Sequence, residues 1–397
     1  MDLVPRRPAF LSRTVVVLGL VSLLQDAGSE MITPLLPVFL VATLGSGPAV
    51  VGLVEGVAEA TASFLKLLSG RLADRGWDKK RLVIGGYGLS NTARPLIGLA
   101  FGWGWVLCLR FFDRVGKGLR TSPRDALISA STPSRLRGKA FGFHRALDHT
   151  GAVVGPLIAY FLLDAGVELR HVFLISVVPG LVLLLLLVFG LEPTPAEAVA
   201  KESLPRLDWR SLDRRLQALI LAAGSLALAS APEVFLVLWA QTRGLEVVWI
   251  PLLWAAASAV KVVVAIPGGH GSDRFGRLPV LVAGWSLRVL ILVALAVSGG
   301  GELTTWVLFL VYAGSLALTE GPERALVGDH APARQSATAF GLFHMTTGLF
   351  ALPGAVLFGA LWQAFEPSVA FLTAAALTAA SVAVLVGVVR RSPPAAA

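Results

Sequence analysis

The chain has 397 residues, of which 55% are hydrophobic and only 15% are charged, and its formal net charge is +9 at pH 7. Soluble domains have about 25% charged residues, so a soluble globule of this composition would be poorly solvated. A mean hydropathy of +0.74 indicates an integral membrane protein instead. Cys108 is the one cysteine, which excludes an intramolecular disulfide and a thiolate metal cluster within the chain.

Apolar segments long enough to cross the hydrocarbon core as helices follow one another along almost the whole sequence. The first contains Gln25, Asp26 and Glu30 and no clear small-residue cleavage site, so we interpret it as a transmembrane helix and not as a signal peptide. The sequence therefore predicts an all-α integral membrane protein with twelve transmembrane helices. The predicted spans are residues 14–40, 48–70, 82–102, 104–130, 139–163, 170–190, 215–240, 247–268, 278–298, 303–328, 335–361 and 367–389.

Lys and Arg gather in the loops on one side of the predicted membrane, whereas the opposite loops contain only Arg170 and Arg243. Because basic residues stay on the cytoplasmic side, we expect both termini and the central loop to be cytoplasmic in a multi-pass protein of the inner membrane. Topology and anionic lipid then explain the positive net charge. We expect the lipid bilayer as a partner and no nucleic acid, because the sequence has no basic soluble module.

The segment 191–214 interrupts the apolar pattern with three prolines and many charges, and it predicts a cytoplasmic linker between bundles of residues 1–190 and 215–397. An Asp-Arg turn occurs in each half, at Asp74 and at Asp273, 199 residues apart. Pro123, Ala126, Pro133, Arg135, Phe141 and Gly142 recur at the same offset as Pro322, Ala325, Pro332, Arg334, Phe340 and Gly341. This repeat predicts two pseudo-symmetric six-helix bundles related by an axis along the membrane normal.

Three motifs resemble signatures of the major facilitator superfamily. Residues Gly70 to Arg81 resemble the family's GxLaDrxGrr loop, and Arg114, Lys117 and Gly118 resemble RxxqG with lysine in place of glutamine. Gly151, Gly155 and Pro156 are similar to the antiporter signature GxxxGP, although Ala159 and Tyr160 replace its two closing glycines.

The resemblance extends over essentially the full chain, and the run from Arg110 to Leu127 is similar to one in poorly characterised bacterial members. It implies the fold of this superfamily, transport by alternating access and no enzymatic activity. We find no phosphate-binding loop, nucleophile elbow or HExxH motif, and we expect no cofactor.

The first half contains an unusual number of charges within predicted membrane spans. Each costs about 2.5 to 3.5 kcal/mol on insertion scales, so such residues are retained mainly where they pair or function. The helical rise places Asp26, Arg94 and Arg114 near mid-membrane. Burial opposes the charge of a carboxylate and a nearby arginine favours it, so such a cluster can load and release a proton when the helices move.

We predict Asp26 as the proton-coupling residue, with Glu30 and Glu59 next and Arg114 as the cationic partner. The alternative is that the charges only hold helices together through pairs such as Asp113 with Lys117 or Arg145 with Asp148. The full predicted cluster comprises Asp26, Glu30, Glu59, Arg94, Asp113, Arg114, Lys117, Arg145 and Asp148.

The second half has fewer such charges, so we expect one bundle to handle ions and the other mainly to shape the substrate pocket. The candidate pocket residues are Arg110, Glu233, Trp239, Trp254 and Arg288, although the tryptophans could instead belong to interfacial belts. His144 and His344 recur between the halves without metal-ligand spacing, so we expect packing hydrogen bonds and no metal site.

Conformational roles are predicted for two further groups of residues. The family resemblance implies that the Asp-Arg turns latch one access state, and loops that only fix orientation are the alternative. The predicted latch comprises Gly70, Asp74, Arg75, Asp273 and Arg274. Gly151, Gly155 and Pro156 would let their helix approach a neighbour and bend, with simple small-residue packing as the alternative.

The sequence as a whole favours a secondary active transporter of a small molecule, coupled to protons and working as an exporter. Proton-coupled uptake of a small solute, with an anion as one option, is the second interpretation, and a non-transporting membrane receptor or an intramembrane enzyme is the third. Acidic and basic groups nearly cancel in the first half, so the charge of the substrate stays open. We expect the protein to act as a monomer.

Overall fold

The computed structural model describes residues 12–74, 77–132, 137–191, 214–330 and 336–391, and these residues form helices joined by short connections. The helices are α1 (Arg13–Glu30), α2 (Leu36–Val38), α3 (Pro48–Asp74), α4 (Lys79–Ala93), α5 (Trp103–Ala130), α6 (Arg137–Asp164), α7 (Leu169–Ile175), α8 (Val177–Gly190), α9 (Arg214–Ala229), α10 (Glu233–Thr242), α11 (Ile250–Phe275), α12 (Arg277–Val297), α13 (Glu302–His330), α14 (Ser336–Ala364) and α15 (Pro367–Arg391). The short turns η1 (Phe39–Thr43), η2 (Pro95–Leu99) and η5 (Val247–Trp249) extend three of the spans.

Each of the twelve predicted spans corresponds to one helix or to a broken pair of helices. In the described part of the chain, nine spans are long and apolar enough to cross a membrane. The remaining three predicted spans contain α1, α4 and α5, which carry most of the buried charges. The all-α membrane fold predicted from the sequence is therefore confirmed.

Several spans are interrupted near their middle, mostly at prolines. A proline cannot donate a backbone hydrogen bond and restricts the residue before it. The break between α4 and η2 falls at Arg94 and Pro95, and the break between α9 and α10 falls just before Pro232. At the second break Tyr312 Oη donates to the Ala231 carbonyl at 2.6 Å, so this backbone oxygen keeps a partner inside the protein.

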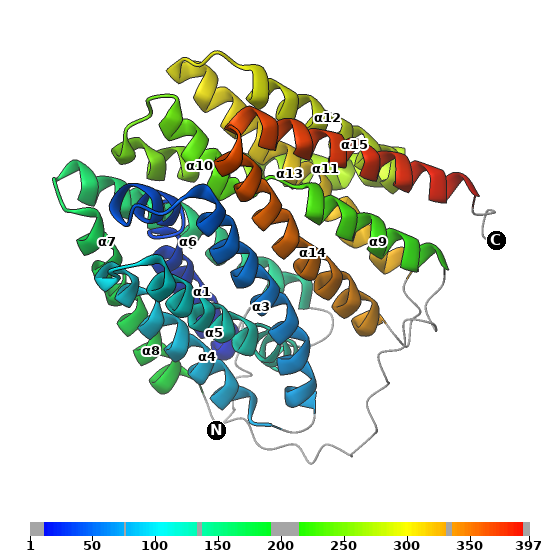
Figure 1. The fold of residues 1–397 in the computed structure, drawn as a ribbon. Helices are drawn as coiled ribbons and strands as arrows, with labels where there is room; N and C mark the ends of the chain where they lie inside the picture. The colour runs from blue at the N-terminus through cyan, green and yellow to red at the C-terminus, as the bar shows by residue number, and fades with distance from the viewer. Residues whose placement is uncertain (1–11, 75–76, 133–136, 192–213, 331–335, 392–397) are drawn as a thin grey trace, which may run out of the picture.

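The helices form two groups, α1 to α8 and α9 to α15, which lie side by side in Figure 1. We name the end at which α8 ends and α9 begins the linker end, which extends along the lower and right-hand side of Figure 1, and the opposite end the far end. Lys80 Nζ binds the Leu191 carbonyl at the linker end at 2.5 Å, and the Ala49 amide binds Gln363 Oε1 at the far end at 3.3 Å. The segment 192–213, most of the predicted linker, lies outside the described residues.

The two halves share a single hydrophobic core at the far end. This core joins Phe39 and Phe173 of the first half to Trp239, Phe358 and Phe371 of the second. Toward the linker end, the described residues form two separate cores, one in each half. The halves are therefore packed together at the far end and have independent cores at the linker end.

Helices α3 and α14 run antiparallel and pack closely along each other between the halves (Figure 1). A Cβ atom on Gly52 would collide with the Ala355 carbonyl, and one on Gly348 would collide with the Ser63 side chain. The two backbones can approach this closely because these positions have no side chain.

Candidate functional site

Two adjoining cavities have volumes of about 350 and 300 Å³, and the larger one lies at the boundary between the halves. Glu55, Gly56 and Glu59 of α3 line the larger one, facing α9 and α14. The smaller one lies within the second half between α9, α12, α13 and α14. Ala227, Ser230 and Thr347 line both cavities, so the two spaces adjoin at the break between α9 and α10. A pocket at broken helices between two halves is the usual position of a transporter's substrate site.

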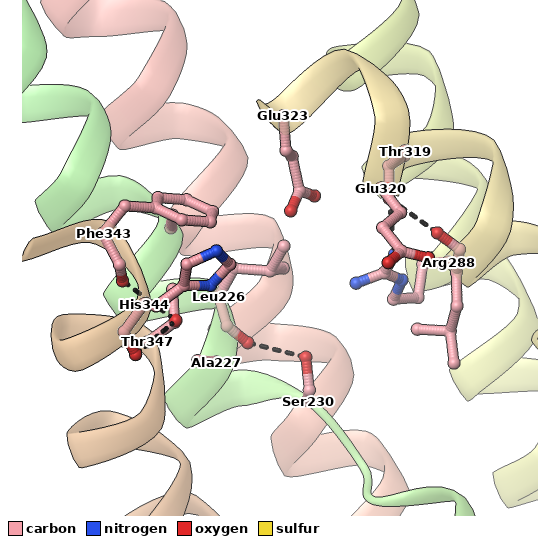
Figure 2. Close-up of a pocket in the computed structure, with 12 residues that line it drawn as sticks. Leu226, Ala227, Ser230, Arg288, Thr319, Glu320, Glu323, Phe343, His344 and Thr347 are labelled. Atoms are coloured by element: carbon pink, nitrogen blue, oxygen red, sulfur yellow. Dashed lines mark hydrogen bonds between the residues drawn. The ribbon is translucent and has the colours of Figure 1, made fainter. Parts of the chain in front are cut away.

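The smaller cavity has charged groups on one wall and a ring-bearing wall opposite (Figure 2). Arg288 and Glu320 lie together on one side, and Phe343 and His344 lie on the other. Glu323 extends from α13 into the space between them, and its carboxylate accepts from Trp285 Nε1 at 2.9 Å. Arg288 is buried and donates from Nη2 to Thr319 Oγ1 at 2.9 Å and to the Ser315 carbonyl at 3.3 Å.

A buried ion network holds α3, α4 and α5 together around Asp113. The Asp113 carboxylate lies 3.0 Å from Arg94, 3.4 Å from Arg110 and 3.7 Å from Arg114. Arg110 also binds Glu55 at 2.9 Å, which links the network to the wall of the larger cavity. A proton could bind Asp113 only by displacing these ion-pair contacts, so the geometry favours a structural role for this group.

The pair of Asp113 with Lys117, named above as an example of the structural alternative, does not form; the partners of Asp113 are the three arginines. Lys117 lies close to Asp26 and Glu59 instead. Arg114, the predicted partner of Asp26, contacts Asp113. Sequence spacing within α5 alone favoured the pair four residues apart, whereas the helix is rotated so that Asp113 faces Arg94 of α4.

Asp26 is within hydrogen-bonding contact of a second carboxyl group, that of Asp148 on α6. Asp148 also accepts from Ser22 Oγ at 2.5 Å and from Arg145 Nη1 at 3.1 Å. Two ionised carboxylates at hydrogen-bonding distance repel each other strongly, so such a pair can hold one proton between its two members. Asp26 lies about 20 Å along α1 from its first residue, well inside the span.

A chain of polar contacts, which we call the polar chain, joins the two halves near the far-end core. Trp254 Nε1 of α11 donates to Glu30 of α1 at 2.8 Å. Lys261 lies over the Trp254 ring, 5.8 Å from its centre, and binds Glu233 at 2.6 Å. Glu30 and Glu233 are thus connected through one indole and one ammonium group.

Among the five candidate pocket residues, Arg288 is the one that lines either cavity. Arg110 is buried between Glu55 and Asp113, and Trp254 belongs to the polar chain, where it binds Glu30. Trp239 is fully buried in the far-end core, and Glu233 is paired with Lys261. Within the predicted ion cluster, Glu59 is the member that lines a cavity.

The residues with predicted conformational roles are only partly described. Arg75 and the side chains of Asp74 and Asp273 lie outside the described residues, so the latch stays a prediction. Gly70 lies against Ser122 of α5, and Arg274 is exposed with its guanidinium over the Phe275 ring.

Gly151 and Gly155 of α6 pack against the backbone of α1, where a Cβ atom would collide with Leu23 and Ala27 carbonyls. They therefore bring α6 and α1 together within the first half and put Asp148 next to Asp26. Pro156 lies inside the same helix.

The cavity residues that sequence reasoning did not select are Glu55, Ser230, Glu320, Glu323, His344 and Thr347. Their signal was present in part, since the charges of residues 303–328 and the recurrence of His344 are visible in the sequence. Which of these side chains face one another depends on the packing of four helices. No group of three His, Cys, Asp or Glu residues suited to a metal ion occurs among the described residues.

Comparison with known proteins agrees with this architecture. A sequence model of the Major Facilitator Superfamily matches residues 18–352. The uncharacterized MFS-type transporter MJ1317 of Methanocaldococcus jannaschii is 33% identical over 370 residues, which cover 91% of each chain. The multidrug resistance protein MdtH of Aeromonas hydrophila is 29% identical over 186 residues, covering 46% of this chain and 47% of MdtH.

Among solved structures, a bacterial homolog of the human lysosomal transporter Spinster, in an inward-facing and occupied conformation, superposes with a TM-score of 0.79. The two are 17% identical, and the match covers 96% of this chain and 98% of the other. The match to the family model and the sequence identity over 91% of the chain agree with the fold. The chain belongs to the Major Facilitator Superfamily of secondary transporters.

Proposed function

We propose that this transporter exports a small solute from the cytoplasm in exchange for protons. The observation that carries the proposal is the contact between Asp26 and Asp148, two carboxyl groups on neighbouring helices inside the membrane span. A shared proton at such a pair is lost or gained when the two helices separate. Movement of α1 against α6 can therefore change the number of bound protons.

Lys117 connects this pair to the substrate cavity. It lies close to Asp26 and also to Glu59, which lines the larger cavity. When the carboxyl pair loses its proton, its added negative charge attracts Lys117 and leaves Glu59 with less compensation. Proton release at the carboxyl pair thereby changes the electrostatic environment of a solute in the larger cavity. Coupled exchange requires such an interaction between the two sites.

The direction of transport depends on the side of the membrane from which a solute can reach the cavities. In the inner membrane with both termini in the cytoplasm, the linker end would be the cytoplasmic side, and the shared far-end core would close the periplasmic side. The cavities would then receive their solute from the cytoplasm. The resemblance of Gly151, Gly155 and Pro156 to the antiporter signature and the partial similarity to a multidrug resistance protein also favour export.

The test uses purified protein in two stages. A thermal-shift screen of amines, carboxylates, nucleosides and sugars first identifies a solute that raises the melting temperature. Proteoliposomes loaded with a pH gradient then report flux of that solute. Export by proton exchange predicts that the solute accumulates in the acidic lumen of vesicles with the cytoplasmic face outward. Accumulation only in the alkaline lumen would instead establish symport, and flux independent of the gradient would exclude proton coupling.

A further inference from the structure

We propose that the smaller cavity binds the cationic end of an amine-bearing solute, with Glu323 as its counter-ion. This inference rests on the proposed transport function and deepens it by assigning the charge of the substrate, which the sequence leaves open. The site lies in the second half, away from the ion network around Asp113, and it requires no proton movement to be tested.

The walls of the two cavities have more carboxylates than arginine and lysine side chains. The described lining of the two cavities contains four carboxylates, those of Glu55, Glu59, Glu320 and Glu323, and Arg288 as the one arginine or lysine. In the first half basic groups lie behind the acidic lining: Arg110 binds Glu55, while Lys66 and Lys117 lie close to Glu59. The lining of the smaller cavity contains two carboxylates, those of Glu320 and Glu323, and one guanidinium, that of Arg288.

Neutral hydrogen-bond donors hold the Glu323 side chain in place. Its carboxylate accepts hydrogen bonds from Trp285 Nε1 and from the Thr319 side chain, both neutral donors, and it extends into the open space toward Phe343 (Figure 2). Arg288 lies across this space with Glu320 and attracts the Glu323 carboxylate from there. A neutral donor fixes the position of the carboxylate without cancelling its charge. An ammonium group between Glu323 and Phe343 would gain an ion pair and the face of an aromatic ring.

The same cavity contains a guanidinium N–H group that has no hydrogen-bond partner in the described part of the chain. Arg288 is 3% exposed, and its Nε has no acceptor among the described residues. A buried guanidinium N–H without a partner is costly, so a ligand that offers an oxygen there would gain affinity. The cavity thus fits a solute with an ammonium group at one end and a carbonyl or ether oxygen near Arg288.

The test uses three probes that share an aminobenzoyl group and differ in charge. Procaine is a protonated amine with an ester carbonyl, benzocaine is the neutral ester, and 4-aminobenzoate is the anion. Each is titrated separately by calorimetry into the full-length protein in detergent at pH 7. We expect procaine to bind at least about tenfold more tightly than benzocaine and 4-aminobenzoate, as for one charged hydrogen bond.

Variants separate a counter-ion from a structural residue. Glu323→Gln should lower procaine affinity about tenfold or more and leave benzocaine binding unchanged, whereas Glu323→Asp should keep the preference for the cation. Glu302→Gln, an exposed carboxylate at the far end of α13, is the matched control and should behave like wild type. Arg288→Met should weaken procaine and benzocaine alike, because both contain the ester. Melting curves confirm that each variant is folded.

The proposal is overturned if wild type binds 4-aminobenzoate or benzocaine as tightly as procaine, if procaine does not bind, or if Glu323→Gln keeps the preference. None of these outcomes bears on proton coupling, because equilibrium binding needs no gradient. Conversely, an amine that binds through Glu323 but moves independently of a pH gradient would contradict the proposed exchange and leave the cation site in place.

Discussion

Trp254 Nε1 donates a hydrogen bond to the Glu30 carboxylate at 2.8 Å, and this bond joins α11 of the second half to α1 of the first. Trp254 is buried, and Lys261 lies over its ring and binds Glu233. The bond must break if the halves separate at the far end. It therefore contributes to the stability of the conformation in which the far end is closed.

Removing this bond should open the far end more often. Trp254→Phe keeps a buried aromatic ring and deletes the donor, leaving the Glu30 carboxylate without it. A hydrogen bond to a charged group contributes about 1.5 to 3 kcal/mol, so the open population should rise roughly tenfold or more. Alkylation of a cysteine introduced at Ser46, a far-end residue, measures this in a Cys108→Ser background. Trp105→Phe, at an exposed ring, is the control; equal labelling in both variants would contradict the assignment.

The network around Asp113 predicts a large loss of stability on neutralisation. Asp113→Asn leaves three guanidinium groups in a buried site without their shared carboxylate. Breaking a buried pair costs about 3 to 5 kcal/mol, so this variant should melt well below wild type in detergent. Asp125→Asn removes a carboxylate that pairs with Arg124 and is 43% exposed, and it should change the melting temperature little. Similar melting of the two variants would show that the network contributes little to stability.

The close packing of α3 along α14 predicts a steric effect at Gly52. Gly52→Ala places a methyl group against the Ala355 carbonyl, and such overpacking costs about 1 to 3 kcal/mol. The helices can relieve it only by moving apart, so we expect faster far-end labelling in the assay above. Gly88→Ala, in α4 with open space around its Cα, is the matched substitution and should be neutral or stabilising. Wild-type labelling of the Gly52→Ala variant would contradict the close packing of the two helices.

The spans and their order could be predicted from the sequence because the hydrophobic requirement of the membrane acts on each helix separately. The Arg145–Asp148 ion pair also followed from local spacing, since both residues lie on α6 three positions apart. Even the three charged spans were recognisable, although α5 contains Arg110, Asp113 and Arg114.

The pairing of charges between helices could not be predicted in the same way. Asp113 meets Arg94 of α4, and Asp26 meets Asp148 of α6, because of how the helices are rotated and packed. The glycines that bring α6 against α1 were visible as a motif, but their neighbour was not. The smaller cavity was missed because Arg288 and Glu323 come from separate helices, α12 and α13, and their proximity depends on how those helices pack.

The most direct test of the central claim, proton coupling through Asp26 and Asp148, compares two kinds of flux in the same proteoliposomes. Asp26→Asn removes one of the two carboxyl groups that we propose share a proton. We predict that it abolishes accumulation of the solute driven by a pH gradient while exchange of labelled for unlabelled solute continues. Asp164→Asn, at an exposed position at the end of α6, is the control and should retain both activities. Accumulation by Asp26→Asn at the wild-type rate would contradict the claim.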